Sequence, residues 1–112
     1  MRVVPLDELI ALQKPVGEFD VAFNVHSFSE CTYAAIEWWM QKIQDLNIPY
    51  LFVIPNTKTD FLTTEMDHTR KNFLPLIEKA GYKIVAQEPL FANPDVQKLL
   101  SIYDHLFLFK RG

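Results

Sequence analysis

Residues 19–47 read FDVAFNVHSFSECTYAAIEWWMQKIQDLN and contain a strand pattern, a polar turn and a helix pattern in direct succession. β-Forming residues concentrate in 19–25, and a polar cluster runs from His26 to Glu30. In an open α/β sheet, ligands bind beyond the carboxyl ends of the strands. The succession therefore places the polar cluster where a binding or catalytic site is expected.

The helix of this unit is predicted to begin at Ser29 or Thr32, either of which can cap its first turn, and to end near residue 46. Its apolar stripe consists of Ile36, Trp39 or Met40, Ile43 and Leu46. Trp38 and Trp39 are adjacent and point about 100° apart, so they cannot both occupy the centre of that stripe. Either one tryptophan borders a pocket or interface, or both pack at the edge of the core.

A second strand is predicted at residues 50–54, followed by the polar turn 55–60. The helix between the two strands has an ordinary length, so a right-handed crossover between parallel strands is expected. The two polar turns should then face one cleft at the same edge of the sheet. Because both strands are apolar on both faces, we expect helices on both sides of the sheet.

The remaining chain predicts further short elements. Residues 2–5 are predicted as a short strand and 6–13 as a short helix. The polar segment 61–72 has no clear pattern, although a helix could begin near Met66. Pro75 either kinks that helix or opens a second helical piece at its first position, and Gly81 ends the helical region. Asn93 is predicted to cap a helix that reaches Leu100.

The last two strands are predicted at 82–88 and 105–109. Their connection is too short for a parallel crossover with a full-length helix, so we predict antiparallel pairing.

Composition restricts the class of protein. The length of 112 residues predicts a single domain, which the strand and helix patterns make α/β, and a hydrophobic content of 49% is ample for its core. Fourteen acidic and 11 basic residues give a net charge of −3, which argues against a nucleic-acid partner. The single cysteine, Cys31, is expected to be a small, partly buried thiol. Neither a signal peptide nor an apolar run of membrane-spanning length is present, so we predict no membrane partner and a cytoplasmic location.

The order of elements resembles the C-terminal half of a class I S-adenosylmethionine-dependent methyltransferase. More narrowly, FDVAFNVHSFSEC, IEWW and YLFVIPN resemble the sugar O-methyltransferases, above all at residues 24–30 and at Pro55 and Asn56. The resemblance implies a Rossmann-like sheet of parallel strands with an antiparallel C-terminal strand. It also implies S-adenosylmethionine as cofactor and a small, sugar-like hydroxyl acceptor.

In that family the cofactor loop and the ribose-binding carboxylate lie in the N-terminal half, which has no counterpart in this sequence. The three glycines, at positions 17, 81 and 112, cannot form a phosphate-cradling loop. The chain therefore resembles an incomplete methyltransferase domain. In the family's strand order, 19–25 would lie beside the absent first strand and would become an edge. We therefore predict a homo-oligomer, joined through this edge or through the helix faces that the absent half would cover. Residues 2–5 could instead fold back as a substitute strand and leave a monomer. A non-catalytic α/β binding or oligomerisation module is the alternative.

The resemblance implies that Asn24, Ser27, Ser29 and Asn56 contact the substrate. His26 and Glu30 are the candidate catalytic residues: one could take the proton of the acceptor hydroxyl while the other orients the imidazole. They could instead cap the helix and bond to each other. Two ligands are too few to predict a metal site.

Structural roles are expected for His68 and His105, and a helix cap is expected at Asp60.

Overall fold

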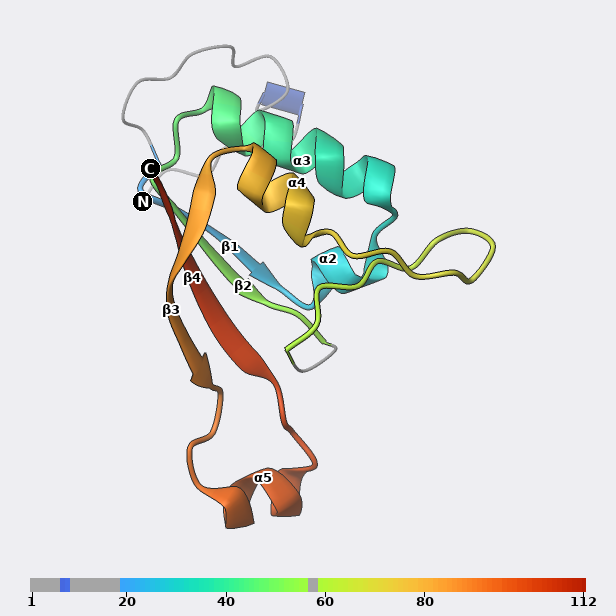
Figure 1. Ribbon diagram of the computed structural model, residues 1–112, viewed down its shortest axis with the longest axis vertical. Helices are drawn as coiled ribbons and strands as arrows, with labels where there is room; N and C mark the ends of the chain where they lie inside the picture. Colours follow the sequence, from blue (N-terminus) through green and yellow to red (C-terminus); the bar gives the residue numbers. More distant parts are fainter. Residues whose placement is uncertain (1–6, 9–18, 57–58) are drawn as a thin grey trace.

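Four strands form one mixed sheet in the order β1-β2-β4-β3 (Figure 1). The computed structural model describes residues 7–8, 19–56 and 59–112, and the predicted strand 2–5 and nearly all of the predicted helix 6–13 lie outside these residues. The strands are β1 (Val21–Val25), β2 (Tyr50–Ile54), β3 (Tyr82–Pro89) and β4 (His105–Arg111). The α/β class and the four strand positions are thus as predicted.

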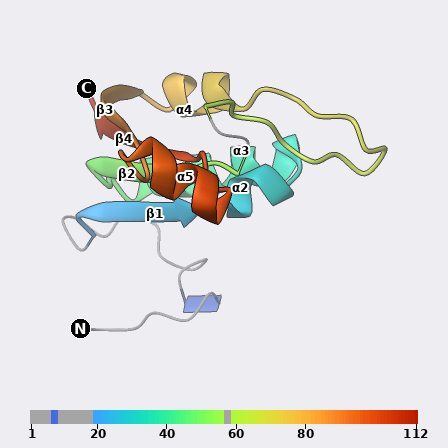
Figure 2. The ribbon, with the colours of Figure 1, turned by 90° about the horizontal axis from the view of Figure 1, so that it is seen from below.

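The pairing of the strands confirms both predicted relationships. β1 and β2 are parallel neighbours, with Val21 opposite Tyr50 and Val25 opposite Ile54. β4 is antiparallel to both β2 and β3, and it therefore lies between them. One irregularity interrupts the β3–β4 ladder between Ile84 and Ala86. Among the described strands, β1 and β3 form the two edges, and Figure 2 shows β1 along one of them.

Local sequence signals explain where the helices begin and end. α3 (Tyr33–Asp45) begins after Thr32, whose hydroxyl accepts a hydrogen bond from the Ala35 N–H at 3.2 Å. α5 (Pro94–Leu100) begins after Asn93, whose side chain accepts bonds from the Asp95 and Val96 N–H groups. α4 (Leu74–Lys79) has Pro75 in its first turn and is followed by Gly81 at φ 95°. These caps and terminators agree with the sequence prediction.

Helices α3 and α4 contact the same face of the sheet, on which the core lies. Figure 1 shows α3 and α4 side by side over the strands, whereas α5 lies beyond the end of the sheet in the β3–β4 connection. The core combines apolar residues of both helices and of the central strands: Ile36, Met40, Ile43, Leu76, Ile77, Leu51, Val53, Phe107 and Phe109. In the described part of the chain these helices cover one face, not the two that we predicted. Phe23 and Val25, at alternate positions of β1, are apolar but exposed. Apolar residues on both faces of the strand therefore suggested burial on both sides, although only one face is covered.

Segment 61–73 corrects the sequence prediction, because no helix begins near Met66. The segment doubles back on itself, with an antiparallel bridge between Leu62 and Asn72. At its tip the Asp67 carboxylate accepts hydrogen bonds from both the N–H and the hydroxyl of Thr69, which hold a turn instead of a helix. These bonds also lower the pKa of Asp67. Asp60 lies next to this segment and precedes no helix, so the predicted cap is wrong.

Tyr82, at the start of β3, is fully buried and donates its hydroxyl hydrogen bond to the carbonyl of Ile48. Replacing Tyr82 with phenylalanine leaves this carbonyl without its partner, so we expect the free energy of unfolding to fall by about 1–3 kcal/mol. Urea denaturation followed by circular dichroism measures the loss. The matched change Tyr50→Phe, at a half-buried position, should cost less than about 0.5 kcal/mol. Equal losses in both variants would contradict this account.

Burial also raises the pKa of Tyr82, an effect that Arg111 partly offsets. The unfolded chain releases this proton near its ordinary pKa of about 10, while the folded chain retains it. The stability that Tyr82 contributes is therefore complete below about pH 10 and is lost as the pH rises through the higher folded pKa. The Tyr82→Phe variant should lose less stability over this alkaline range than the unmodified chain.

Candidate functional site

Two turns, one after each parallel strand, meet at the carboxyl edge of the sheet. The His26 N–H donates a hydrogen bond to the Ile54 carbonyl at 2.7 Å, and the Asn56 N–H donates to the Ser29 hydroxyl at 3.1 Å. The predicted position of Asn56 on the same edge as residues 26–30 is therefore confirmed. The short helix α2 (Ser27–Glu30) follows β1 directly and carries three of the predicted site residues.

His26 is held at this edge by its backbone and by its side chain. Its backbone is left-handed, with φ 65°, a conformation in which histidine is more common than most residues. Its Nε2 lies 2.9 Å from Oδ2 of Asp104, so the imidazole and the carboxylate form a hydrogen-bonded pair. The His26 side chain remains partly exposed, whereas that of Asp104 is mostly buried. Although His26 occupies the N-cap position of α2, its side chain makes no capping bond.

Asp104 is a site residue that no sequence pattern had singled out. It lies 78 residues beyond His26, immediately before β4. Because β4 is antiparallel to β2, the start of β4 lies at the edge where β1 and β2 end. A carboxylate directly before a predicted antiparallel strand was therefore the signal that could have identified it. The carboxylate in contact with His26 is thus Asp104, while Glu30 is exposed at the end of α2.

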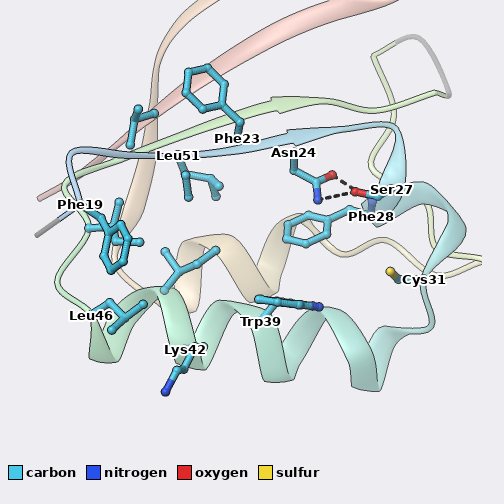
Figure 3. Close-up of a pocket in the computed structure, with 14 residues that line it drawn as sticks. Phe19, Phe23, Asn24, Ser27, Phe28, Cys31, Trp39, Lys42, Leu46 and Leu51 are labelled. Atoms are coloured by element: carbon cyan, nitrogen blue, oxygen red, sulfur yellow. Dashed lines mark hydrogen bonds between the residues drawn. The ribbon is translucent and has the colours of Figure 1, made fainter. Parts of the chain in front are cut away.

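Asn24 and Ser27 organise the turn that presents His26. The Asn24 amide donates to the Ser27 hydroxyl at 2.8 Å, and its carbonyl oxygen accepts from the Phe28 N–H at 2.9 Å (Figure 3). Asn24 thus satisfies a backbone donor in the first turn of α2, as a cap would. Ser27 stays exposed, so its hydroxyl can also face a ligand.

Ser29 connects three segments and is almost fully buried. Its hydroxyl accepts the bond from Asn56, while its carbonyl accepts from the Thr64 hydroxyl at 2.8 Å and from Nη2 of Arg70 at 3.4 Å. These bonds fasten segment 61–73 to the turn that carries His26. Of the four predicted substrate-contacting residues, Ser29 is therefore the one most engaged in holding the site together, whereas Asn56 is exposed.

A cavity of about 490 Å³ lies between β1 and α3, beside the candidate site. Its lining is mostly apolar and includes Phe19, Phe28, Trp39 and Leu46, with Asn24 and Ser27 near its polar end (Figure 3). Trp39 lines this cavity and its ring meets the exposed Trp38 ring edge to face, with centroids 4.9 Å apart. One tryptophan of the pair therefore borders a pocket, as the first of the two predicted alternatives stated.

Cys31 also lines the cavity and is partly buried, as expected. Burial and, to a smaller extent, the neighbouring Glu30 carboxylate raise the pKa of its thiol. At neutral pH the thiol therefore stays protonated, a form unsuited to nucleophilic attack.

The other histidines are separate from the His26–Asp104 pair. His68 is exposed in the turn of segment 61–73, also with a left-handed backbone. His105 is partly buried, and its Nδ1 is buried without a hydrogen-bond partner in the described part of the chain. Residues 7–8, 19–56 and 59–112 contain no group of three or more histidine, cysteine, aspartate or glutamate side chains that could hold a metal ion.

Comparisons with known proteins found no family model that matches this chain and no match among curated proteins. No helix in the described residues is both long enough and apolar enough to cross a membrane.

Proposed function

We propose that this chain is the C-terminal half of a methyltransferase-like enzyme that modifies a hydroxyl group of a small, sugar-like acceptor. The observation that carries the proposal is the His26–Asp104 pair, 2.9 Å apart, at the edge where the two parallel strands end. A histidine oriented by a carboxylate is a common general base for hydroxyl groups. The antiparallel last strand and the likeness of residues 24–30 to sugar O-methyltransferases support the same class.

The proposed role of His26 is to take the proton of the attacking hydroxyl. With Nε2 facing Asp104, the nitrogen left for this proton is Nδ1. The Asp104 carboxylate would stabilise the positive imidazolium that forms and fix the ring orientation beforehand. Ser27 and Asn56, both exposed at the same edge, would donate hydrogen bonds to the other hydroxyls of the acceptor. Glu30, the other predicted catalytic residue, is exposed at the end of α2, and Asp104 takes the orienting role that was proposed for it.

The residues present do not fit the cofactor by themselves. S-adenosylmethionine would supply the methyl group, but the chain has no glycine pair that could form the loop around it, because its glycines are at 17, 81 and 112. We therefore propose that an N-terminal half provides the cofactor site in the complete protein. Residues 1–112 would contribute the acceptor side.

This division predicts that the 112-residue chain binds S-adenosylmethionine weakly or not at all. Calorimetric titration should show no binding in the low-micromolar range. A dissociation constant of a few micromolar would mean that the cofactor site does not need an N-terminal half. S-adenosylhomocysteine is titrated in parallel, because its lack of the sulfonium charge separates charge attraction from recognition of the nucleoside.

The acceptor role is tested by nuclear magnetic resonance on the chain alone. Titration with a panel of free monosaccharides should shift the backbone amides of residues 26–30 and of Asn56, at millimolar concentrations. Methyl transfer is then measured with radiolabelled cofactor, after adding an N-terminal half that carries the Gly-rich loop. If no sugar shifts these amides, or if shifts map to α5 instead, the proposed acceptor site is wrong.

The alternative class, a non-catalytic binding or oligomerisation module, is favoured by one observation. The edge strand β1 exposes Phe23 and Val25 to solvent. Such an edge serves association whether or not the site at its end is catalytic. Absence of sugar binding together with stable self-association would favour the module.

A further inference from the structure

Strand β1 forms one edge of the described sheet, and one side of its backbone is directed away from β2. In a parallel ladder, every second residue directs its backbone N–H and C=O toward the neighbouring strand. The N–H and C=O of the residues between them point to the other side of the strand. The bond from the His26 N–H to the Ile54 carbonyl shows that the even-numbered residues face β2. The backbone groups of Val21, Phe23 and Val25 therefore point outward, where a further strand could bind them.

The side chains of the same residues form an apolar surface on the face of the sheet opposite α3 and α4. Phe23 is 69% exposed and Val25 is 54% exposed. The Phe23 ring lies against that of Phe52 on β2, with centroids 5.4 Å apart. An exposed apolar edge strand of this kind favours pairing with another strand.

The sequence of β1 is complementary to itself when the strand is reversed. Read in either direction, Val21-Ala22-Phe23-Asn24-Val25 has valines at both ends and phenylalanine at the centre. In an antiparallel pair centred on Phe23, each Val21 would lie opposite a Val25 and the two phenylalanines opposite each other. Aromatic and β-branched pairs of this kind stabilise a sheet by about 0.2–1 kcal/mol each.

The polar residues at the ends of β1 favour the antiparallel arrangement over a parallel one. The exposed Asp20 precedes the strand and His26 follows it. Antiparallel pairing centred on Phe23 brings Asp20 of one copy to the His26 end of the other. Parallel pairing would instead place two Asp20 carboxylates side by side, where they repel each other.

We propose that β1 is the interface through which two copies of this chain associate, with a twofold axis through the Phe23 pair. The outward backbone groups of Val21, Phe23 and Val25 form the ladder between the copies, and twice four strands give one continuous eight-stranded sheet. The axis is perpendicular to the sheet, so α3 and α4 of both copies lie on one side. This inference does not rest on the proposed function. An N-terminal half of the proposed kind would place its own first strand on β1, so that strand and a second copy of this chain are alternative partners of the same edge.

Light scattering on the full chain at micromolar concentration tests the association. The expected mass is twice 13.1 kDa, or 26.2 kDa. Val25→Lys places a charge in the interface and should return the mass to 13.1 kDa. The matched control is Val85→Lys, because Val85 is also 54% exposed but lies on the opposite edge strand, β3. A monomeric unmodified chain, or a dimer that only Val85→Lys disrupts, would overturn the proposal.

Cysteine crosslinking tests the register and direction in a Cys31→Ser background. Residues opposite each other in a hydrogen-bonded antiparallel pair have Cα atoms about 5.5 Å apart, which suits a disulfide. Phe23→Cys should therefore crosslink to itself, and Val21→Cys should crosslink to Val25→Cys when the two variants are mixed. Val21→Cys alone should stay uncrosslinked. Efficient crosslinking of Val21→Cys to itself, without the mixed product, would indicate parallel pairing and contradict the proposed axis.

Discussion

Replacing Phe73 with alanine is expected to lower the free energy of unfolding by about 3–5 kcal/mol. Phe73 precedes α4 and is 0% exposed. Its ring packs edge to face against Phe28 of α2, with centroids 5.8 Å apart, and against Phe61, at 5.5 Å. Truncation removes both aromatic contacts and leaves a cavity that the backbone on either side cannot fill. Because small domains are stable by only about 5–15 kcal/mol, this change should remove a large part of the total.

Urea denaturation followed by far-ultraviolet circular dichroism measures this loss. The control is Met66→Ala, a large-to-small change at a side chain that is 90% exposed, which should change the stability by less than about 0.5 kcal/mol. A second measurement separates local from global effects. In the folded fraction of Phe73→Ala, the amides of α2 should exchange with solvent faster, because Phe28 has lost its support. A loss below about 1 kcal/mol would mean that the three rings are not a packing unit.

The second large effect is expected at His26. In the completed enzyme, His26→Asn should lower kcat by about 10²–10⁴-fold, the usual contribution of a positioned general base. Asparagine is chosen because it tolerates the left-handed backbone at φ 65° and so leaves the turn intact. Acceptor shifts seen by nuclear magnetic resonance on the chain alone should persist, because the change removes the base and keeps Ser27 and Asn56.

His68→Asn is the matched control, since His68 has φ 68° but lies in the exposed turn of segment 61–73. It should leave kcat within about twofold of the unmodified enzyme. Asp104→Asn should lower kcat with little change in KM, as expected for a residue that positions and stabilises the imidazole without touching the acceptor. If His26→Asn and His68→Asn have equal activity, His26 is not the base.

Much of the fold follows from local signals that are present in the sequence. Thr32 and Asn93 cap their helices through their own side chains, and Pro75 and Gly81 mark the start and end of α4. The antiparallel pairing of the last two strands followed from the length of their connection alone. Each cap bonds to a backbone group only a few residues away, and the two strands are joined by a short connection. Spacing in the sequence therefore determines these contacts.

The features that escaped prediction depend on contacts between distant residues. The His26–Asp104 pair spans 78 residues, and it became visible only once β4 was placed beside β2. Segment 61–73 was polar enough for a helix surface, but local bonds between Asp67 and Thr69 hold a turn at its tip. Distant bonds from Thr64 and Arg70 to the carbonyl of Ser29 hold the rest of the segment against the site. The one-sided cover of the sheet was missed because an exposed Phe23 and a buried phenylalanine are identical in a pattern of apolar residues.

The position of Asp104 has a consequence for the order in which this protein is made. During synthesis, residues 19–56 can leave the ribosome and pair β1 with β2 while the chain beyond them is still absent. The inner edge of β2 then has no partner until the residues of β4, the last strand in the sequence, have emerged and inserted between β2 and β3. His26 acquires its carboxylate only at that moment. A growing chain therefore has no assembled His26–Asp104 pair. A stop codon directly after His105 would leave both members of the pair in the sequence but would remove the strand β4 that supports it.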